Sequence, residues 1–368
     1  MKDKIRHIIT TVIFAIFILT FSVWNIVKAE DKYSDAERRS LASFPEITWE
    51  SILSADFMSD FEDFTLDQFP LRDTFRTIKA VSEKYLFIKM DNNDIYSSQG
   101  HISKLEYPLD YRMLDNAADK FSFIYEKYLA DSGSKVYFSI VPDKNYFLAE
   151  KNGYLSVDYN ELVSYMKNKT GYMQYIDITD KLSLDCYYTT DTHWKQEYII
   201  PVAEFIGQSM GVSVSSDYKK NVLDNPFYGV YHGQSALPFT ADTITYLTSE
   251  TLDRCSVTSY DTGKPTKKDI YDMTEAFGKD PYEMFLSGTE ALLVIENPKA
   301  EANRKLVLFR DSFGSSLAPL LVEGYSKITL IDIRYINPMM LGAFVNFEGS
   351  DVLFMYSTML LNNSTSFK

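Results

Sequence analysis

The stretch between residues 306 and 322 constrains the fold more than any other part of the chain. It begins with a continuous apolar run, Leu306–Phe309, which is typical of a strand buried on both faces. A polar turn follows, and a helix is predicted over Ser315–Val322. A buried strand that leads through a short turn into a helix is a unit of α/β proteins. Ser312 lies in that turn, where α/β enzymes place a nucleophile.

Other short apolar runs predict further buried strands, and they alternate with helical segments. The strands are expected at Val136–Val141, Tyr175–Ile178, Ile328–Ile331 and Val352–Met355. The helices are expected over Tyr111–Ala130, over Tyr159–Asn168 and within Thr190–Gly211, with a possible kink at Pro201 and a cap at Gly211. The alternation predicts an α/β domain with a mainly parallel sheet of about five strands. The less regular region 221–300 is expected to cover one side of it.

The first 29 residues are predicted to anchor the chain in a membrane. Basic residues precede Ile8–Val27, an uncharged run of about 20 residues that is long enough to cross a bilayer as a helix. The positive flank predicts a cytoplasmic N-terminus and an exported remainder. Cleavage after Val27-Lys28-Ala29 as a signal peptide is the alternative, although the apolar run is long for one. In both cases the chemistry is expected outside the cytoplasm.

The rest of the chain is expected to have two parts. Residues 30–75 are predicted to be a juxtamembrane linker and a helical segment, because helical periodicity runs through Trp49–Met90. Residues 76–368 are predicted to form the catalytic domain, which contains a hairpin over Ile95–Leu105.

Composition excludes several functions. The formal net charge of −14 argues against binding of nucleic acid or anionic lipid. Two cysteines, Cys186 and Cys255, are too few for a disulfide framework or a cysteine metal site, and they either form one bridge or stay free. No two of the four histidines have metal-ligand spacing, and no G-x-G-x-x-G fingerprint occurs. The sequence therefore predicts neither a metal nor a cofactor.

A nucleophilic Ser312 requires a base and a group that orients the base. Asp191 and His193 offer both, since a carboxylate two residues before a histidine can hydrogen-bond one ring nitrogen. The remaining histidines fit less well: His7 precedes the anchor, and His101 has no acidic neighbour nearby. The alternative is that Ser312 or Asp311 only caps a helix and that His193 is an exposed loop residue.

Four further residues are candidate substrate contacts. Arg334 and Tyr335 follow a predicted strand, and ligands bind at the carboxyl ends of parallel strands. A salt bridge with Asp332 is an equally good explanation for Arg334. His232 and Trp194 complete the set, with a structural role as the alternative for His232.

Seven segments in a fixed order support a resemblance to a known family. They span roughly residues 34–335 and read SDAERRSLASFPE, FTLDQFPLRDTF, DTHW, YGVYHGQSALPFTADTI, DPYEMFLSG, RKLVLFRDSFGSSLAPLL and IDIRY. In this order they resemble the DHHW family and the related alginate O-acetyltransferases, which carry a permuted SGNH-hydrolase domain with a flavodoxin-like, three-layer fold.

The resemblance implies a Ser-His-Asp triad, here Ser312, His193 and Asp191, with Asp-x-His before the serine. Thr192 stands where the family name expects a histidine, which the alginate-type branch tolerates. Arg310 replaces the glycine of the superfamily's Gly-Asp-Ser, so the oxyanion hole is assigned only to backbone amides near Ser312–Gly314.

The resemblance also implies an activity. It is that of an extracytoplasmic O-acyltransferase, an O-acetyltransferase above all, which modifies a cell-surface or secreted polysaccharide through an acyl-serine. The acyl group would come from a membrane-bound O-acyltransferase partner. The alternatives are a carbohydrate esterase or deacetylase with the same triad, and a non-catalytic polysaccharide-binding module of an export complex.

Overall fold

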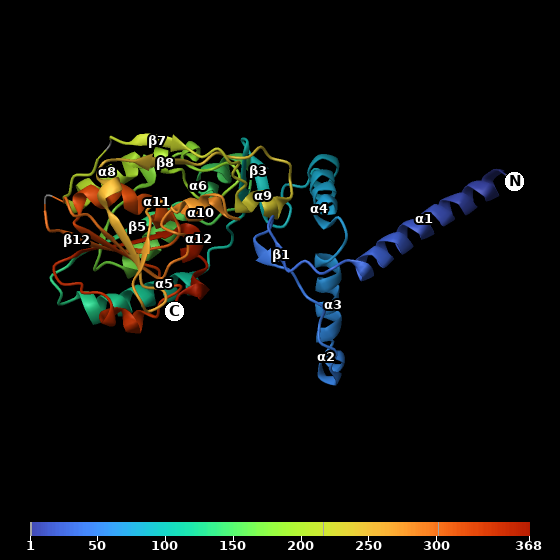
Figure 1. Cartoon of the computed structure of the whole chain (residues 1–368), viewed down its shortest axis with the longest axis horizontal. Coiled ribbons are helices and arrows are strands. Elements are labelled where there is room, and N and C mark those ends of the chain that lie inside the picture. Colours follow the sequence, from blue (N-terminus) through green and yellow to red (C-terminus); the bar gives the residue numbers. More distant parts are fainter. Residues whose placement is uncertain (1, 216, 301) are drawn as a thin grey trace. The chain divides into compact units, whose positions relative to one another are not determined.

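The computed structural model describes residues 2–215, 217–300 and 302–368. The chain divides into two compact units, which are treated separately (Figure 1). The N-terminal unit consists of the residues up to Asn93 together with His232–Pro238. The C-terminal unit consists of Asp94–Tyr231 and Phe239–Lys368.

The C-terminal unit is built on a mixed sheet of eight strands in the order β10-β9-β11-β13-β12-β14-β5-β6. Its parallel part consists of β5 (Lys135–Val141), β6 (Gln174–Tyr175), β12 (Lys305–Arg310), β13 (Lys327–Ile331) and β14 (Asp351–Ser357). Four of these match predicted strands, whereas the strand predicted at Tyr175–Ile178 is observed only as the two-residue β6. The predicted α/β class with a mostly parallel sheet is confirmed.

The strand number was predicted too low, because region 221–300 extends the sheet. Three antiparallel strands from this region join the edge of β13, namely β9 (Ser256–Ser259), β10 (Thr266–Lys268) and β11 (Leu292–Glu296). Strands β9 and β10 contain only four and three residues, and their sequences SVTS and TKK have no apolar run that would mark them. A second hairpin in this region, β7 (Lys219–Val222) with β8 (Thr245–Thr248), forms a separate sheet.

Two apolar cores lie on the two faces of the large sheet. Successive residues of β12 alternate between them, with Leu306 and Leu308 in one core and Val307 and Phe309 in the other. This alternation is expected because neighbouring side chains of a strand point to opposite faces. One core includes residues of α8 (Ile200–Met210), and the other includes residues of α5 (Tyr111–Ile124) and α7 (Tyr159–Lys169).

Most helix boundaries follow the predictions, but the helix predicted over Ser315–Val322 is a short α-helix, Phe313–Leu317, followed by a 3-10 helix, Ala318–Gly324. Helix α5 continues as a π-helical turn, Tyr125–Leu129. Pro201 lies in the first turn of α8, where proline is tolerated, and Gly211 ends the helix at φ +75°. The predicted hairpin is present as β3 (Ile95–Ser98) and β4 (His101–Lys104). The remaining short helices are α6 (Lys144–Leu148), α9 (Val230–Ser235), α10 (Met273–Ala276), α11 (Phe313–Leu317) and α12 (Thr358–Leu361).

The N-terminal unit begins with α1 (Lys2–Val27), an exposed apolar helix. Within the described residues it is the one helix that is long and apolar enough to cross a membrane, with a mean hydropathy of 2.1 in its most apolar window. Both an anchor and a signal peptide fit this helix. A two-residue ladder of β1 (Tyr33–Ser34) with β2 (Arg39–Ser40) follows, and then α2 (Trp49–Leu53), α3 (Asp56–Asp67) and α4 (Arg72–Val81).

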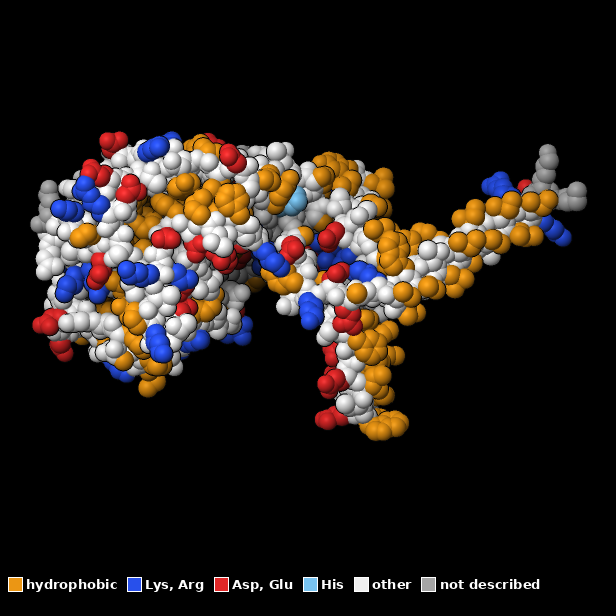
Figure 2. Space-filling model, viewed as in Figure 1, with side chains coloured by type: hydrophobic (Ala, Val, Ile, Leu, Met, Phe, Trp, Pro, Cys, Tyr) orange, Lys and Arg blue, Asp and Glu red, His pale blue; other side chains and the backbone are white. Residues whose placement is uncertain are grey.

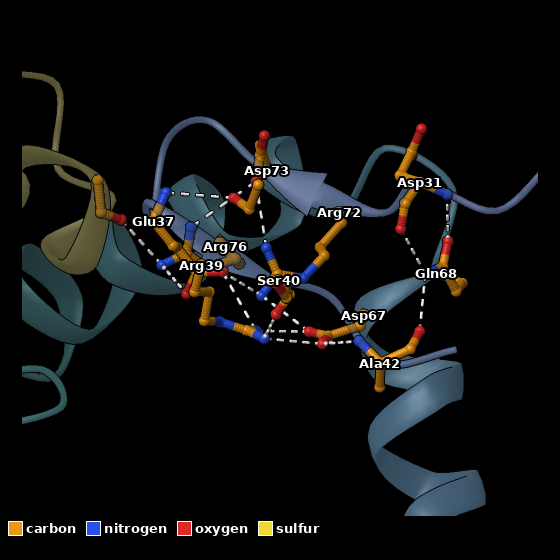
Figure 3. A network of polar contacts seen from close by, with 12 residues as sticks. Asp31, Glu37, Arg39, Ser40, Ala42, Asp67, Gln68, Arg72, Asp73 and Arg76 are labelled. Atoms are coloured by element: carbon orange, nitrogen blue, oxygen red, sulfur yellow. Dashed lines mark hydrogen bonds and ion pairs between the residues drawn. The ribbon is translucent and has the colours of Figure 1, made fainter. Parts of the chain in front are cut away.

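A polar network holds the N-terminal unit together (Figure 3). Asp67 at the end of α3 accepts hydrogen bonds from Arg39 and from the amide of Ala42, and these bonds hold the pKa of Asp67 below its usual range. Arg72 and Arg76 of α4 form ion pairs with Glu37. Three of the segments on which the family resemblance rests therefore meet here, because Arg76 also donates to the carbonyl of Gly233 at 2.9 Å.

Candidate active site

Ser312 lies two residues after the end of β12, at the carboxyl end of the parallel part of the sheet. Every other residue from Leu306 to Val322 is buried, and Ser312 alone is partly exposed. Its backbone is in the ordinary right-handed region, with φ −61° and ψ −23°, so the turn carries no backbone strain. The fold therefore presents one hydroxyl to solvent from a stretch that is otherwise core.

Asp311 fixes the turn that carries this hydroxyl. Its buried carboxylate accepts the amide of Phe313 at 3.0 Å through one oxygen and the amide of Ser357 at 2.8 Å through the other. The second bond ties the turn to the end of the neighbouring strand β14. Asp311 therefore holds the turn in place through two backbone amides.

His193 and Asp191 meet Ser312 in the geometry of a hydrolytic triad. The Nε2 atom of His193 lies 2.7 Å from Oγ of Ser312, and its Nδ1 atom lies 2.6 Å from Oδ1 of Asp191. The Asp191 side chain is fully buried, whereas that of His193 is 12% exposed. The amides of His193 and Val230 donate to the two oxygens of the Asp191 carboxylate. These bonds orient the carboxylate toward the ring.

The loop before Asp191 is held by a second carboxylate. Asp242 accepts the amides of Thr189 and Thr190 at 2.8 and 2.7 Å and the hydroxyl of Thr190. Gly229 then packs directly against Asp191: a Cβ at Gly229 would lie only 2.3 Å from Cβ of Asp191. A side chain at position 229 would therefore displace the aspartate.

The imidazole of His193 is held flat against an aromatic ring. Tyr282 stacks on it with ring centroids 3.9 Å apart and an interplanar angle of 8°. The Tyr282 hydroxyl lies 2.8 Å from Oγ of Ser316, which also accepts the indole N–H of Trp194 at 2.9 Å. Burial raises the pKa of Tyr282 well above its ordinary value, so it remains a neutral phenol. The stack restricts the imidazole to the plane that faces Ser312.

Lys144 donates to the carbonyls of Tyr188 and Thr189, at 3.0 and 3.2 Å, from beneath the loop that carries Asp191. Burial lowers the pKa of Lys144 to about 7, against the opposing effect of Asp191 and Asp242. The unfolded chain, with an ordinary lysine pKa, then binds more protons than the folded chain between about pH 7 and 10.

Lys144→Met is expected to remove this pH dependence of stability. Relative to the variant, the wild type should gain up to about 1.4 kcal/mol of unfolding free energy per pH unit as the pH rises through that window. Urea unfolding of both proteins across the window measures the difference. Two stability curves that stay parallel would contradict the prediction.

Of the four candidate substrate contacts, Arg334 and Tyr335 lie against each other. Arg334 forms a bidentate ion pair with the buried Asp332, at 2.9 and 2.6 Å, as its alternative explanation required. Tyr335 is 44% exposed and lies under the Arg334 guanidinium. Trp194 is fully buried, so the structure gives it a packing role in place of the predicted substrate contact. His232 belongs to the N-terminal unit and is not assigned to this site.

The amides expected to form the oxyanion hole are partly occupied. Phe313 donates to the Asp311 carboxylate, and Gly314 donates to the Asp311 carbonyl at 3.1 Å. The amide of Ser312 is the remaining candidate of the predicted set.

Among the described residues, no group of three or more His, Cys, Asp or Glu side chains is arranged to hold a metal ion. Cys186 and Cys255 are both free thiols, whereas the sequence allows either free thiols or one disulfide bridge.

Several supporting residues escape sequence reasoning. Tyr282, Asp242 and Gly229 lie in segments used for the family resemblance, but their contacts with the Asp191–His193 loop arise from pairings between residues far apart in the sequence. Lys144 could have been found from one local signal: it lies next to a predicted buried strand, so its neighbours predict that the lysine is buried too.

Comparison with known proteins identifies the class of fold. No protein-family model and no curated protein sequence matches the chain. Among solved structures, a DHHW family protein from Eubacterium siraeum matches with a TM-score of 0.61 and 23% identity, over 74% of this chain and 93% of that chain. Bacillus cereus PatB1 with a sulfonyl adduct also matches at 0.61, with 19% identity, over 74% of this chain and 97% of PatB1.

A third structure, the O-acetyltransferase domain of Pseudomonas putida AlgJ, has a TM-score of 0.40 and 11% identity, over 68% and 84% of the two chains. That likeness is too weak to support an argument. The first two matches confirm the predicted resemblance at the level of the fold. The chain has an α/β fold that matches, over 74% of its length, the structure of a DHHW family protein.

Proposed function

We propose that this protein is an extracytoplasmic O-acyltransferase, of the O-acetyltransferase kind, that modifies a cell-surface or secreted polysaccharide through an acyl-serine intermediate. One observation carries the proposal: Ser312 Oγ lies 2.7 Å from a histidine that is itself oriented by a buried carboxylate. These distances are within hydrogen-bond reach for a nucleophile, its base and the group that orients the base.

In the first half-reaction, Oγ of Ser312 attacks the carbonyl carbon of the acyl donor, and Nε2 of His193 takes the hydroxyl proton. Asp191 stabilises the imidazolium that forms. The amide of Ser312 donates to the developing oxyanion, which places one backbone donor at the reacting carbon. When the tetrahedral intermediate collapses, His193 returns the proton to the leaving group, and the acyl group stays on Ser312 as an ester.

In the second half-reaction a sugar hydroxyl attacks the acyl-serine. Nε2 of His193, neutral again, takes the proton of that hydroxyl and later gives it to Oγ of Ser312. The products are an O-acylated sugar and the free serine. Hydrolysis follows the same path with water in place of the sugar, so the outcome depends on which nucleophile reaches the acyl-serine.

The family resemblance supports the choice of substrate and partner. It suggests a polysaccharide acceptor and a membrane-bound O-acyltransferase as the source of the acyl group. An export signal or anchor at α1 agrees with a site outside the cytoplasm. PatB1, one of the similar structures, carries a sulfonyl adduct, and sulfonyl reagents attach to nucleophilic side chains. We expect the same reactivity from Ser312.

The proposed activity is tested by giving the purified full-length protein an activated acetyl ester and a panel of neutral and acidic oligosaccharides. We expect O-acetylated sugar, detected by mass spectrometry, and acetate release that changes when sugar is added. If acetate is released at the same rate with and without sugar, and no acetylated sugar forms, the proposed transferase activity is overturned in favour of an esterase. An absence of both products with a correctly folded protein would overturn the enzyme.

A further inference from the structure

Large apolar side chains are concentrated on the surface of one segment of the N-terminal unit. They belong to α2, α3, α4 and the π-helical turn Ser82–Leu86 with the residues that follow it. Among the most exposed of them are Trp49 at 82%, Leu53 at 84%, Met58 at 66%, Leu86 at 71%, Phe87 at 66% and Ile88 at 81%. Contiguous exposed apolar surface of this kind marks an interaction site.

The helices of this segment are amphipathic. In α3, Phe57, Phe61 and Phe64 follow the spacing of one helix face, and Phe44 packs on the last two with ring centroids 6.0 and 5.3 Å away. Figure 2 shows hydrophobic side chains along one side of α2 and α3 and acidic side chains along the other. At the end of α3, Asp67 joins the polar network and is therefore directed into the unit.

The apolar face is continuous with helix α1. Phe21 of α1 stacks on Phe69 at 5.5 Å and meets Phe75 edge-on at 5.7 Å, and Phe69 and Phe75 contact each other at 5.6 Å. Phe21 lies within two turns of the end of α1 at Val27, or about 9 Å along the helix. If α1 spans a bilayer, these rings lie near its outer surface.

The direction of the apolar face agrees with that position. Within the N-terminal unit, α2 and α3 run across the line of α1 (Figure 1), and their hydrophobic side is the side from which α1 leaves (Figure 2). Helices that lie in a membrane interface have this arrangement, with the apolar face buried at the boundary between headgroups and acyl chains. Tryptophan is favoured at that depth, and Trp49 is almost fully exposed.

We propose that the apolar face of residues 49–90 is a membrane-binding surface that lies flat in the outer leaflet beside α1. Its occupant is the lipid bilayer, because the surface is continuous with a helix of membrane-spanning length and faces the same side. Its acidic polar side gives no reason for attraction to anionic lipid, so zwitterionic lipid suffices. The surface would hold the catalytic unit at the membrane even after removal of α1 as a signal peptide.

The proposal is tested by the fluorescence of Trp49 in the full-length protein reconstituted into phosphatidylcholine vesicles. Trp24 of α1 is changed to Phe, and Trp194 is fully buried, so accessible emission comes from Trp49. Lipids with brominated acyl chains are expected to quench this emission strongly. The quenching should disappear in Trp24→Phe/Trp49→Phe. Emission of Trp49 that brominated lipid leaves unchanged would overturn the proposal in favour of a protein occupant.

Charged variants provide the second measurement. Leu53→Asp and Ile88→Asp change side chains that are more than four-fifths exposed, so folding should not suffer. Each is expected to reduce the quenching of Trp49 by lifting the surface out of the interface. Leu155→Asp, at a 59% exposed leucine of the C-terminal unit, is the matched control and should leave the quenching unchanged. Equal quenching in all three variants, or quenching that requires phosphatidylglycerol, would contradict the proposal.

Discussion

Ser312→Ala is expected to abolish acyl transfer and to leave the fold intact. The change removes the nucleophilic oxygen, and losses of this kind in serine enzymes are on the order of 10⁶ in rate. Stability should hardly change, because Ser312 is partly exposed and the partner of its hydroxyl, Nε2 of His193, remains accessible to water. The measurements are acetyl transfer to oligosaccharide, covalent labelling by a sulfonyl fluoride, and thermal unfolding.

Ser315→Ala is the matched control for this variant. Ser315 lies in the same short helix but is buried, so the substitution should retain both transfer and labelling. Labelling that persists in Ser312→Ala, or acetyl transfer near the wild-type rate, would show that another group is the nucleophile. Neither the proposed transferase activity nor the alternative esterase activity through Ser312 would then be supported.

Gly229→Ala is expected to damage the site from the side of Asp191. The new methyl carbon would lie 2.3 Å from Cβ, 2.4 Å from Cα and 2.5 Å from the backbone nitrogen of Asp191, closer than real Cβ contacts. Relief requires a backbone shift, and overpacking of this kind costs about 1–3 kcal/mol or more. Because Asp191 would lose its alignment with His193, the rate should fall by up to about 10⁴, as when a triad aspartate loses its function.

Gly171→Ala serves as the control for a glycine substitution as such. Its new methyl carbon would meet only backbone oxygens, at 3.6 and 3.9 Å, which are ordinary contact distances. Activity and unfolding free energy should stay close to those of the wild type. If Gly229→Ala matched this control in both measurements, the close packing of Gly229 on Asp191 would not matter for the site.

The parts of the fold that sequence predicts are those with a strong local signal. The strands at the centre of the sheet are apolar on both faces, and β12 and β14 are buried along almost their whole length. The antiparallel strands β9 and β10 form at the edge, where polar residues suffice, and their pairing with β11 depends on contacts between residues distant in sequence. Periodicity within a short window cannot report such pairings.

The candidate site divides in the same way. The Asp-x-His spacing and a serine after a buried strand are local patterns, and all three residues of the predicted triad can be found from them. The stacking of Tyr282 on His193 joins residues 89 positions apart, and the bond from Thr190 to Asp242 joins residues 52 positions apart. Local position was a poor guide for Arg334 and Trp194. Arg334 follows a strand, but its side chain pairs with Asp332, and Trp194 follows the histidine, but its side chain is buried.

The return of His232–Pro238 to the N-terminal unit has a consequence for the order in which the protein matures. Arg76 and the Gly233 carbonyl are separated by 157 residues, and a Cβ at Gly233 would overlap the carbonyl of Ala36. Contacts of such separation form late, because the entropy of closing a long loop opposes them. While the chain is synthesised, the N-terminal unit therefore stays incomplete until residue 238 has been added. By then Asp191 and His193 are already part of the chain, whereas Ser312 has yet to follow.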